Sequence, residues 1–366
     1  MAFSARRTRA TAAARKAGIH ALLVTHLPDV RWLSGFTGSN AALVLTAPKS
    51  GAAKGVLFTD GRYTAQAKAE ARGVGVVIAQ KNAAAAATEW LGAQRVRRCG
   101  FDDGNTSVAA LKQMRETLPA KKRRGLFEPV GSLVSTLRWV KDADEISKMR
   151  RAASLGCRLF EEILSVMEPG MTESAVAAEL EYRARLSGAE AMSFPTIVAS
   201  GQRSALPHGM ASAAKLPKHG FVTLDFGVVL DGYCSDMTRT VHMGRATDEE
   251  RAVYEAVLAA QEMGVAAVRA GVTGGDVDEA ARSILRSVKL DKWFTHSTGH
   301  GVGLEIHEGP RLAAKQNQKL ETGMVVTIEP GVYMPGKFGV RIEDMVLVTS
   351  RGGEILTPCT KAWIEL

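Results

Sequence analysis

Three of the eight histidines lie within thirteen residues, in the segment 296–308, His-Ser-Thr-Gly-His-Gly-Val-Gly-Leu-Glu-Ile-His-Glu. His296 and His300 have the i,i+4 spacing that places two metal-binding imidazoles on one face of a helix. Three glycines crowd the same segment, however, and glycine weakens a helix. We therefore predict an irregular, glycine-hinged turn that continues into a short alternating strand over residues 304–307. Such a turn would bring imidazoles together at one point.

Four acidic residues stand at the ends of apolar strands or just beyond a turn. Asp225 ends an apolar run, and Asp236 follows a glycine-containing turn, so a hairpin would bring the two together. Glu329 and Glu343 flank a second, Gly/Pro-rich turn in the same way. One buried acid of this kind is best explained by a salt bridge or a turn cap, because an unpaired buried carboxylate is costly. Four of them beside a histidine segment form an oxygen-rich set that suits two divalent ions.

The elements that must position these residues form a weak internal repeat. Residues 169–176 match 270–277 at an offset of 101, and residues 222–228 match 326–332 at an offset of 104. Two units are too few for a solenoid, but they suit a pseudo-twofold domain with its site at the seam. Hydrophobic periodicity predicts the long helices of this domain. They are residues 144–167, 172–187, 248–269 and 275–288.

Residues 20–130 alternate between strand and helix patterns, which indicates a separate α/β domain. The predicted strands are 21–25, 41–46, 55–59, 74–79 and 98–101, and the predicted helices are 64–72, 83–93 and 108–118. A Pro/Gly break follows near residue 130, with a short helix over 132–140. At 366 residues the chain exceeds the usual size of one core. We predict two domains, 1–130 and 131–366.

The net charge of +9 is divided unevenly, with +14 in residues 1–150 and −5 in residues 151–366. The acidic part carries the histidine segment and favours cations over phosphate backbones, so we expect no nucleic-acid partner. The basic cluster 121–124 is interpreted as a solvated loop. We also expect no membrane partner, because no apolar run approaches the roughly 20 residues that span a bilayer.

The cysteines and the N-terminal segment bear on the cellular compartment in which the protein resides. The four cysteines are far apart and form no CxxC pair, which predicts a reducing compartment and neither a disulfide framework nor a structural zinc. Residues 1–18 carry five basic residues and no acid, a pattern shared by some transit peptides. A first surface helix is favoured, because the segment runs directly into an apolar strand. We expect a cytoplasmic protein.

In order and context, five residues resemble the metal ligands of the "pita-bread" metallopeptidases, the family of methionine aminopeptidase, prolidase and aminopeptidase P. They are Asp225, Asp236, His300, Glu329 and Glu343. Residues 200–209, 300–308 and 329–333 resemble the Xaa-Pro branch, and residues 30–40 and 58–63 resemble its N-terminal domain. The resemblance implies a creatinase-like α/β N-terminal domain, a pseudo-twofold catalytic domain whose curved antiparallel sheet is flanked by helices, and a homodimer.

The resemblance also implies how the five ligands divide between two divalent ions. Asp225 would chelate one ion, Asp236 and Glu343 would bridge the pair, and His300 and Glu329 would complete the second. Manganese is the expected metal, with cobalt, zinc and iron as alternatives. Such a pair lowers the pKa of a bridging water and clamps the attacked carbonyl.

Further roles follow from the same resemblance. Glu329 would carry the proton to the leaving proline nitrogen, and His208 and His307 would hydrogen-bond the substrate carbonyl and the tetrahedral oxyanion. His296 would line the proline pocket, and Arg341 would hold a ligand carboxylate. The remaining interpretations concern residues outside the ligand set. Tyr333 would orient the substrate or pack, Trp32 would reach a partner subunit's cleft, and His219 and His242 are interpreted as surface or core residues.

The implied activity is hydrolysis of the Xaa-Pro bond at the N-terminus of short proline-containing peptides. The phrase over residues 36–40 favours aminopeptidase P. A prolidase would need a cation for the dipeptide's carboxylate, and Arg311 could supply it. A non-catalytic pita-bread binding protein would be expected to have lost metal ligands, and none is lost here. The remaining support for this alternative is the net charge of +14 in the N-terminal part. Creatinase-like hydrolysis would leave five intact ligands without a purpose, and the large N-terminal domain disfavours methionine aminopeptidase.

Overall fold

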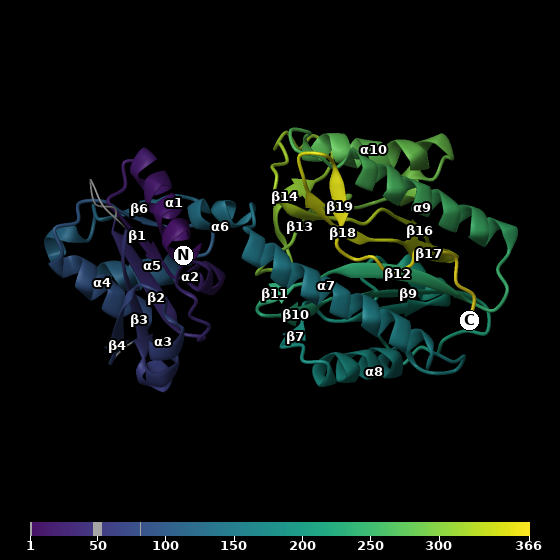
Figure 1. Cartoon of the computed structure of the whole chain (residues 1–366), viewed down its shortest axis with the longest axis horizontal. Coiled ribbons are helices and arrows are strands. Elements are labelled where there is room, and N and C mark those ends of the chain that lie inside the picture. Colours follow the sequence, from purple (N-terminus) through teal and green to yellow (C-terminus); the bar gives the residue numbers. More distant parts are fainter. Residues whose placement is uncertain (1, 47–52, 81) are drawn as a thin grey trace. The chain divides into compact units, whose positions relative to one another are not determined.

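The computed structural model describes residues 2–46, 53–80 and 82–366, and the chain divides into two compact units, Met1–Arg138 and Trp139–Leu366 (Figure 1). The first unit is built on a six-stranded mixed sheet with the strand order β4-β3-β2-β1-β5-β6. Its strands are β1 (Ala21–Val24), β2 (Ala41–Thr46), β3 (Lys54–Asp60), β4 (Gly75–Ala79), β5 (Cys99–Phe101) and β6 (Phe127–Pro129). Its helices are α1 (Ala2–Lys16), α2 (Leu27–Ser34), α3 (Thr64–Glu70), α4 (Ala83–Ala93), α5 (Val108–Thr117) and α6 (Leu133–Arg138), with 3-10 turns η1 (Gly61–Tyr63) and η2 (Ala120–Lys122).

Helix α1 occupies the basic N-terminal segment. Arg6 and Arg7 are buried, and their guanidinium groups donate to the backbone carbonyls of Trp32 and Leu33 in α2. Trp32 is only 1% exposed, so the prediction that it reaches a partner's cleft is wrong. Helix α2 itself was not predicted from the sequence, because eight residues give little periodicity.

Helix α6 is tied into the first unit by a buried ion pair. The Arg138 guanidinium lies 2.6 Å from Asp29 Oδ1, and both side chains are at most 2% exposed. Charges buried this deeply are stable only when paired. This ion pair explains why the first compact unit extends through α6.

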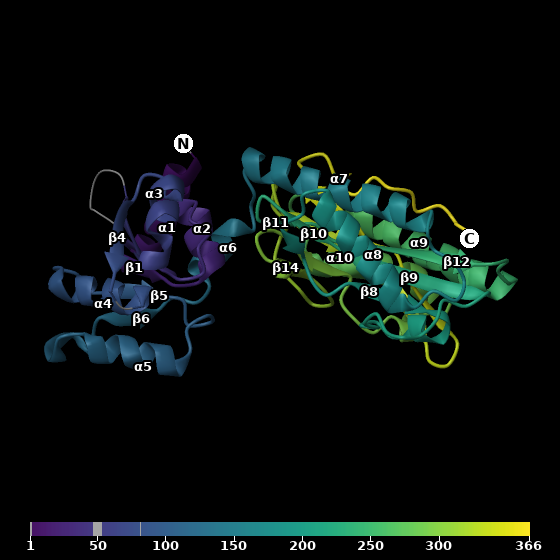
Figure 2. The same ribbon diagram turned by 90° about the horizontal axis from the view of Figure 1, so that it is seen from below.

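The second unit holds four long helices, α7 (Ala143–Leu164), α8 (Glu173–Leu186), α9 (Asp248–Ala267) and α10 (Gly274–Ser287). Helices α7 and α8 contact each other, as do α9 and α10 (Figures 1 and 2). Each pair buries apolar side chains against strands of its own half. In the part of the chain that the structure describes, no helix is both long and apolar enough to cross a bilayer.

The strands of the second unit pair antiparallel throughout. The first half contains β7 (Ala191–Met192), β8 (Ile197–Ser200), β9 (Gly220–Phe226), β10 (Val228–Leu230), β11 (Tyr233–Cys234) and β12 (Met237–Met243). The second half contains β13 (Gly299–Gly301), β14 (Glu308–Leu312), β15 (Val325–Ile328), β16 (Gly331–Met334), β17 (Phe338–Arg341), β18 (Asp344–Val348) and β19 (Gly353–Ile355). Short 3-10 turns η3 (Gly201–Ala205) and η4 (Asp291–Trp293) complete the unit.

The internal repeat is visible in matching local contacts. The Thr172 side chain caps α8, and its backbone bridges Lys215. Thr273 caps α10 in the same way, and its backbone bridges Lys319. These pairs are offset by the spacings found in the sequence. The predicted fold class, an α/β first domain followed by a pseudo-twofold antiparallel domain with flanking helices, is confirmed.

The histidine segment differs from its prediction. Residues 299–301 form strand β13, residues 304–307 are an irregular bend, and the next strand, β14, begins only at Glu308. Close packing explains two of the glycines. A Cβ at Gly299 would lie 1.9 Å from the Thr327 carbonyl oxygen, and one at Gly301 would lie 2.0 Å from that of Gly309. Glycine is required because neighbouring backbones pass too close for any side chain.

Candidate metal centre

The first pair of predicted ligands lies where β9 meets β12. Asp225 is the second-last residue of β9, and Thr238 is its partner across the ladder. Asp236 directly precedes β12, so the hairpin places both carboxylates at one end of the same ladder. Both residues are less than 9% exposed.

The second pair is presented by β15 and β18 in the same manner. Glu329 follows β15, and its N–H donates to the Thr298 carbonyl at 2.8 Å. Glu343 directly precedes β18, and its N–H donates to the Thr238 carbonyl at 3.1 Å. This last bond connects the two hairpins, which are distant in sequence, at their carboxylate-bearing ends.

His300 completes the cluster from the middle of β13. Its Nε2 lies 3.6 Å from Asp236 Oδ2 and 3.5 Å from Glu329 Oε1. One ligand atom each from Asp236, His300 and Glu343 falls within 4.8 Å of the others. The Nδ1 atom lies 3.0 Å from the Gly301 carbonyl, which assigns the proton to Nδ1 and leaves the Nε2 lone pair facing the acids. Burial lowers the pKa of His300 to about 4, so the ring is neutral at pH 7.

The carboxylates repel one another in a largely buried site. Burial and then the neighbouring acids raise the pKa of Asp236 and Glu343 well above their usual range, and burial raises that of Glu329 to about 8. Asp225 Oδ1 is buried and has no hydrogen-bond partner among the described residues. An orphaned oxygen, clustered acids and a neutral imidazole lone pair are the donor set that hard divalent cations fit. The five residues therefore fit the predicted pair of ions.

Arg341 is the buried cation of the site. Its Nη2 lies 2.6 Å from Asp225 Oδ2, and its Nε donates to Thr238 Oγ1 at 3.1 Å. Thr238 Oγ1 in turn donates to Glu343 Oε2 at 2.7 Å. One guanidinium thus orients carboxylates from both hairpins, one directly and the other through a hydroxyl. Local sequence pattern does not mark Thr238, whose importance depends on a partner more than a hundred residues away.

Tyr333 and His296 extend this arrangement toward the pocket. Arg341 Nη1 donates to the Tyr333 hydroxyl at 2.7 Å, and that hydroxyl lies 2.9 Å from His296 Nε2. Burial lowers the pKa of His296 to about 4 and raises that of Tyr333 to about 12, so both groups are neutral at pH 7. Tyr333 is buried behind the pocket wall, where it fixes the orientation of His296.

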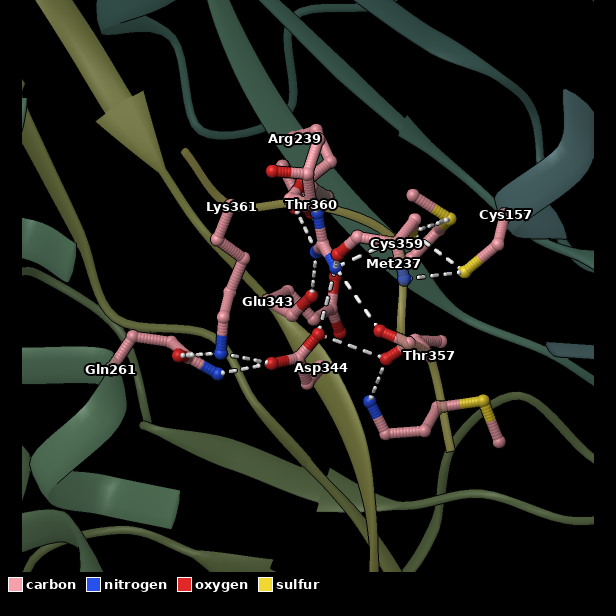
Figure 3. Close-up of polar contacts among 12 residues, drawn as sticks. Cys157, Met237, Arg239, Gln261, Glu343, Asp344, Thr357, Cys359, Thr360 and Lys361 are labelled. Carbon is pink, nitrogen blue, oxygen red and sulfur yellow. Dashed lines mark hydrogen bonds and ion pairs between the residues drawn. The ribbon is translucent and has the colours of Figure 1, made fainter. Parts of the chain in front are cut away.

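A second polar network, which the sequence did not suggest, supports Glu343 from behind (Figure 3). The guanidinium of Arg239 donates to the carbonyls of Thr238 and Glu343 and pairs with Asp344 Oδ1 at 2.9 Å. Asp344 is fully buried and also binds Lys361 Nζ at 2.6 Å. The available signal was weak, since it consisted of an arginine three residues after Asp236 and an acid directly after Glu343.

The site opens into a pocket of about 540 Å³, within the usual range for small-ligand sites. The exposed side chains of His208, His307 and Arg311 line it together with His296. The ring centroids of His300 and His307 are 4.4 Å apart. Arg311 in β14 is the direct cross-strand partner of His300 in β13. The acids are therefore surrounded by imidazoles that can bind a substrate carbonyl and by a guanidinium that can bind an anion.

Known proteins share this arrangement over the whole chain. Residues 147–350 match the model of metallopeptidase family M24, and residues 6–140 match that of the creatinase/prolidase N-terminal domain. An uncharacterised peptidase of Bacillus subtilis is 38% identical over 349 residues, 95% of this chain and 96% of the relative. The structure of a Xaa-Pro dipeptidase from Bacillus anthracis is similar with a TM-score of 0.94 at 38% identity, covering 100% of both chains. An X-Pro aminopeptidase from Thermotoga maritima is similar with a TM-score of 0.88 at 35% identity, covering 97% of this chain and 100% of that one.

The network behind Glu343 predicts a large effect for Asp344→Asn. The substitution leaves the buried Arg239 guanidinium and the Lys361 ammonium without their counter-charge, which typically costs about 3–5 kcal/mol. Glu354→Gln on the adjacent strand β19 is the matched control. It breaks an exposed pair with Arg150 and should cost less than about 1 kcal/mol. Urea denaturation of the metal-loaded proteins measures both, and equal losses would contradict the supporting role.

The crowded acids predict a pH-dependent stability of the metal-free protein. A group whose pKa is higher in the folded than in the unfolded chain stabilises the fold at low pH, and this contribution is lost as pH rises through the folded pKa. We therefore expect the Tm of the chelator-treated protein to fall as pH rises from about 5 to about 9, through the Glu329 pKa of about 8.

Divalent ions should remove that dependence, because bound cations replace the protons. Calorimetry with Mn²⁺ and with chelator compares the two slopes, and parallel slopes would refute the electrostatic explanation. Glu329→Gln should flatten the slope of the metal-free protein. Glu262→Gln on the exposed face of α9 serves as the control and should leave the slope unchanged.

Proposed function

The chain belongs to metallopeptidase family M24 and is a Xaa-Pro exopeptidase, and we propose that it acts as a dipeptidase on free Xaa-Pro dipeptides. The observation that carries the proposal is the position of Arg311. Its side chain is exposed in the pocket, it lies opposite His300 in the β13–β14 ladder, and it forms no ion pair with any residue in the described ranges. A free guanidinium beside the reacting bond is suited to the C-terminal carboxylate that only a dipeptide presents there.

Family M24 enzymes use two divalent ions, and we propose that this chain holds them as its ligand order suggests. Asp225, Asp236, His300, Glu329 and Glu343 would hold the two ions, with Asp236 and Glu343 shared between them. The oxygen-rich set favours manganese. When bound, the ions lower the pKa of a water and polarise the scissile carbonyl.

The protein's own groups position the peptide and move the proton. Glu329 takes a proton from the attacking water and delivers it to the proline nitrogen as the C–N bond breaks. His208 and His307 donate hydrogen bonds to the substrate carbonyl and to the oxyanion that develops from it. Neutral His296, held by Tyr333, forms an uncharged wall against which the proline ring packs.

Substrate length distinguishes this activity from that of aminopeptidase P, the second candidate. The sequence phrase over residues 36–40 and the likeness to the Thermotoga maritima X-Pro aminopeptidase favour this alternative. The likeness to the Bacillus anthracis Xaa-Pro dipeptidase and the free Arg311 favour the dipeptidase. In an aminopeptidase, the chain beyond proline would have to pass Arg311 without a carboxylate to bind it.

Arg311→Ala should raise KM for Xaa-Pro dipeptides about 10- to 100-fold, because a charge-assisted hydrogen bond contributes about 1.5–3 kcal/mol. Lys319→Ala removes an exposed charge from the same segment outside the pocket and should leave KM unchanged. Proline release from matched di- and tripeptides with Mn²⁺ provides the measurement. Rapid cleavage of Xaa-Pro-Yaa tripeptides, with no effect of Arg311→Ala, would favour the aminopeptidase instead.

Glu343→Ala tests the metal assignment. Loss of a bridging carboxylate should remove metal along with activity, so we expect the purified variant to bind fewer Mn²⁺ ions per chain than wild type and to release no proline. Glu262→Ala removes an exposed acid from the same unit and should match wild type in both measurements. Normal metal occupancy in Glu343→Ala would exclude the bridging role.

A further inference from the structure

We propose that His219, His242 and Glu250 form a second metal site, for Zn²⁺ or a similar borderline divalent cation. The three residues come from separate elements of the second unit. His219 directly precedes β9, His242 lies near the end of β12, and Glu250 lies in the first turn of α9. From the sequence alone, both histidines were interpreted as ordinary surface or core residues.

The spacing of the three side chains fits a single ion. His219 Nε2 lies 3.3 Å from Glu250 Oε2, and His242 Nε2 lies 3.4 Å from Glu250 Oε1. One ligand atom from each residue lies within 4.8 Å of the others. Zinc–nitrogen and zinc–oxygen bonds of about 2.0–2.1 Å in a tetrahedron place neighbouring ligand atoms about 3.3 Å apart. Two imidazoles and one carboxylate are also a ligand set that zinc accepts, with water in the fourth position.

The strongest indication is the orientation of His242, whose side chain is fully buried. Its Nδ1 lies 2.8 Å from the Gly244 carbonyl, to which it must donate. In the neutral ring, Nε2 then carries a lone pair and faces a carboxylate oxygen, which is another acceptor. Within the described part of the chain, this nitrogen makes no hydrogen bond. Two buried acceptors face each other stably only when a cation or a proton lies between them. Holding Nδ1 with a backbone carbonyl is how metal-binding histidines are commonly oriented.

The surroundings fix the other parts of the site. Glu250 Oε2 accepts hydrogen bonds from the N–H and Oγ1 of Thr247 at 2.8 Å each, in the capping box of α9, so the carboxylate cannot swing away. Trp363 stacks on the His242 ring with centroids 5.7 Å apart. His219 is half-exposed, which leaves a path for the ion and for water ligands.

A proton on His242 Nε2 is the competing explanation, since it would make an ion pair with Glu250. The position of His219 favours the metal, because a second imidazole approaches the same carboxylate and an ion can bind all three groups at once. The site is also separate from the candidate metal centre. His242 lies six residues along the chain from Asp236, about 20 Å in an extended strand. A bound ion would join β9, β12 and α9 at the far end of the ladder.

Zinc stoichiometry tests the site. The experiment compares wild type with His219→Ala and with the control His20→Ala, which removes an exposed histidine of the first unit. Each protein is saturated with Zn²⁺, dialysed and assayed for metal per chain. We expect wild type and His20→Ala to bind one zinc more than His219→Ala, with proline release unchanged in all three after Mn²⁺ loading. Because His219 is exposed, the variant should keep its fold, which the Tm in chelator verifies. Equal zinc content in wild type and His219→Ala would overturn the proposal.

A zinc-edge anomalous difference map of wild-type crystals gives the location. The expected peak lies between the ring nitrogens of His219 and His242 and the carboxylate of Glu250. A peak on His219 alone would identify an adventitious surface ion and overturn the proposal. Absence of any peak there, with zinc present at the candidate metal centre, would assign a proton to His242 Nε2 and equally overturn it.

Discussion

The electrostatic constraint on this molecule is the burial of four carboxylates around one imidazole. Among the described residues, only Asp225 of these four acids forms an ion pair with an arginine or lysine, and its partner is Arg341. Burial, and then the repulsion of neighbouring acids, raises the pKa of Asp236, Glu329 and Glu343 above the usual range. The clustered acids are therefore electrostatically unfavourable, and bound divalent cations would relieve this cost. The fold must hold the acids in place against their mutual repulsion.

Two features of the fold provide this restraint. The acids stand at the ends of two antiparallel hairpins, and a backbone hydrogen bond from Glu343 to Thr238 joins these hairpins. Behind that bond, Arg239 donates to the carbonyls of Thr238 and Glu343, and buried Asp344 neutralises its charge. A fully satisfied polar network of this kind is rigid, whereas a partly satisfied one is costly. The geometry of the clustered acids is thus supported by Arg239 and Asp344, which lie behind the cluster.

The sequence was informative where chemistry and local pattern coincide. The acids stand at or near the ends of apolar strands, the long helices are marked by apolar periodicity, and the repeat offsets reappear as matching caps in α8 and α10. It was uninformative where the cause is a distant neighbour. Glycine at 299 reflects the approach of the Thr327 backbone, not local bending. Likewise, Cys157 and Cys359 are 202 positions apart, yet their sulfur atoms lie 2.6 Å apart in the core (Figure 3). No local rule predicts either contact.

The same distinction applies to substrate choice. Dipeptidases and aminopeptidases that cleave before proline need the same attack on the same bond, so the five proposed ligands carry no information about peptide length. Discrimination must come from a group beyond the metal centre. A site that binds an ionised carboxylate rejects a peptide lacking one more strongly than a hydrophobic pocket rejects an extra methylene, because the unmatched charge loses its partner. Arg311 has the position for this role, since the β13–β14 ladder places it opposite His300.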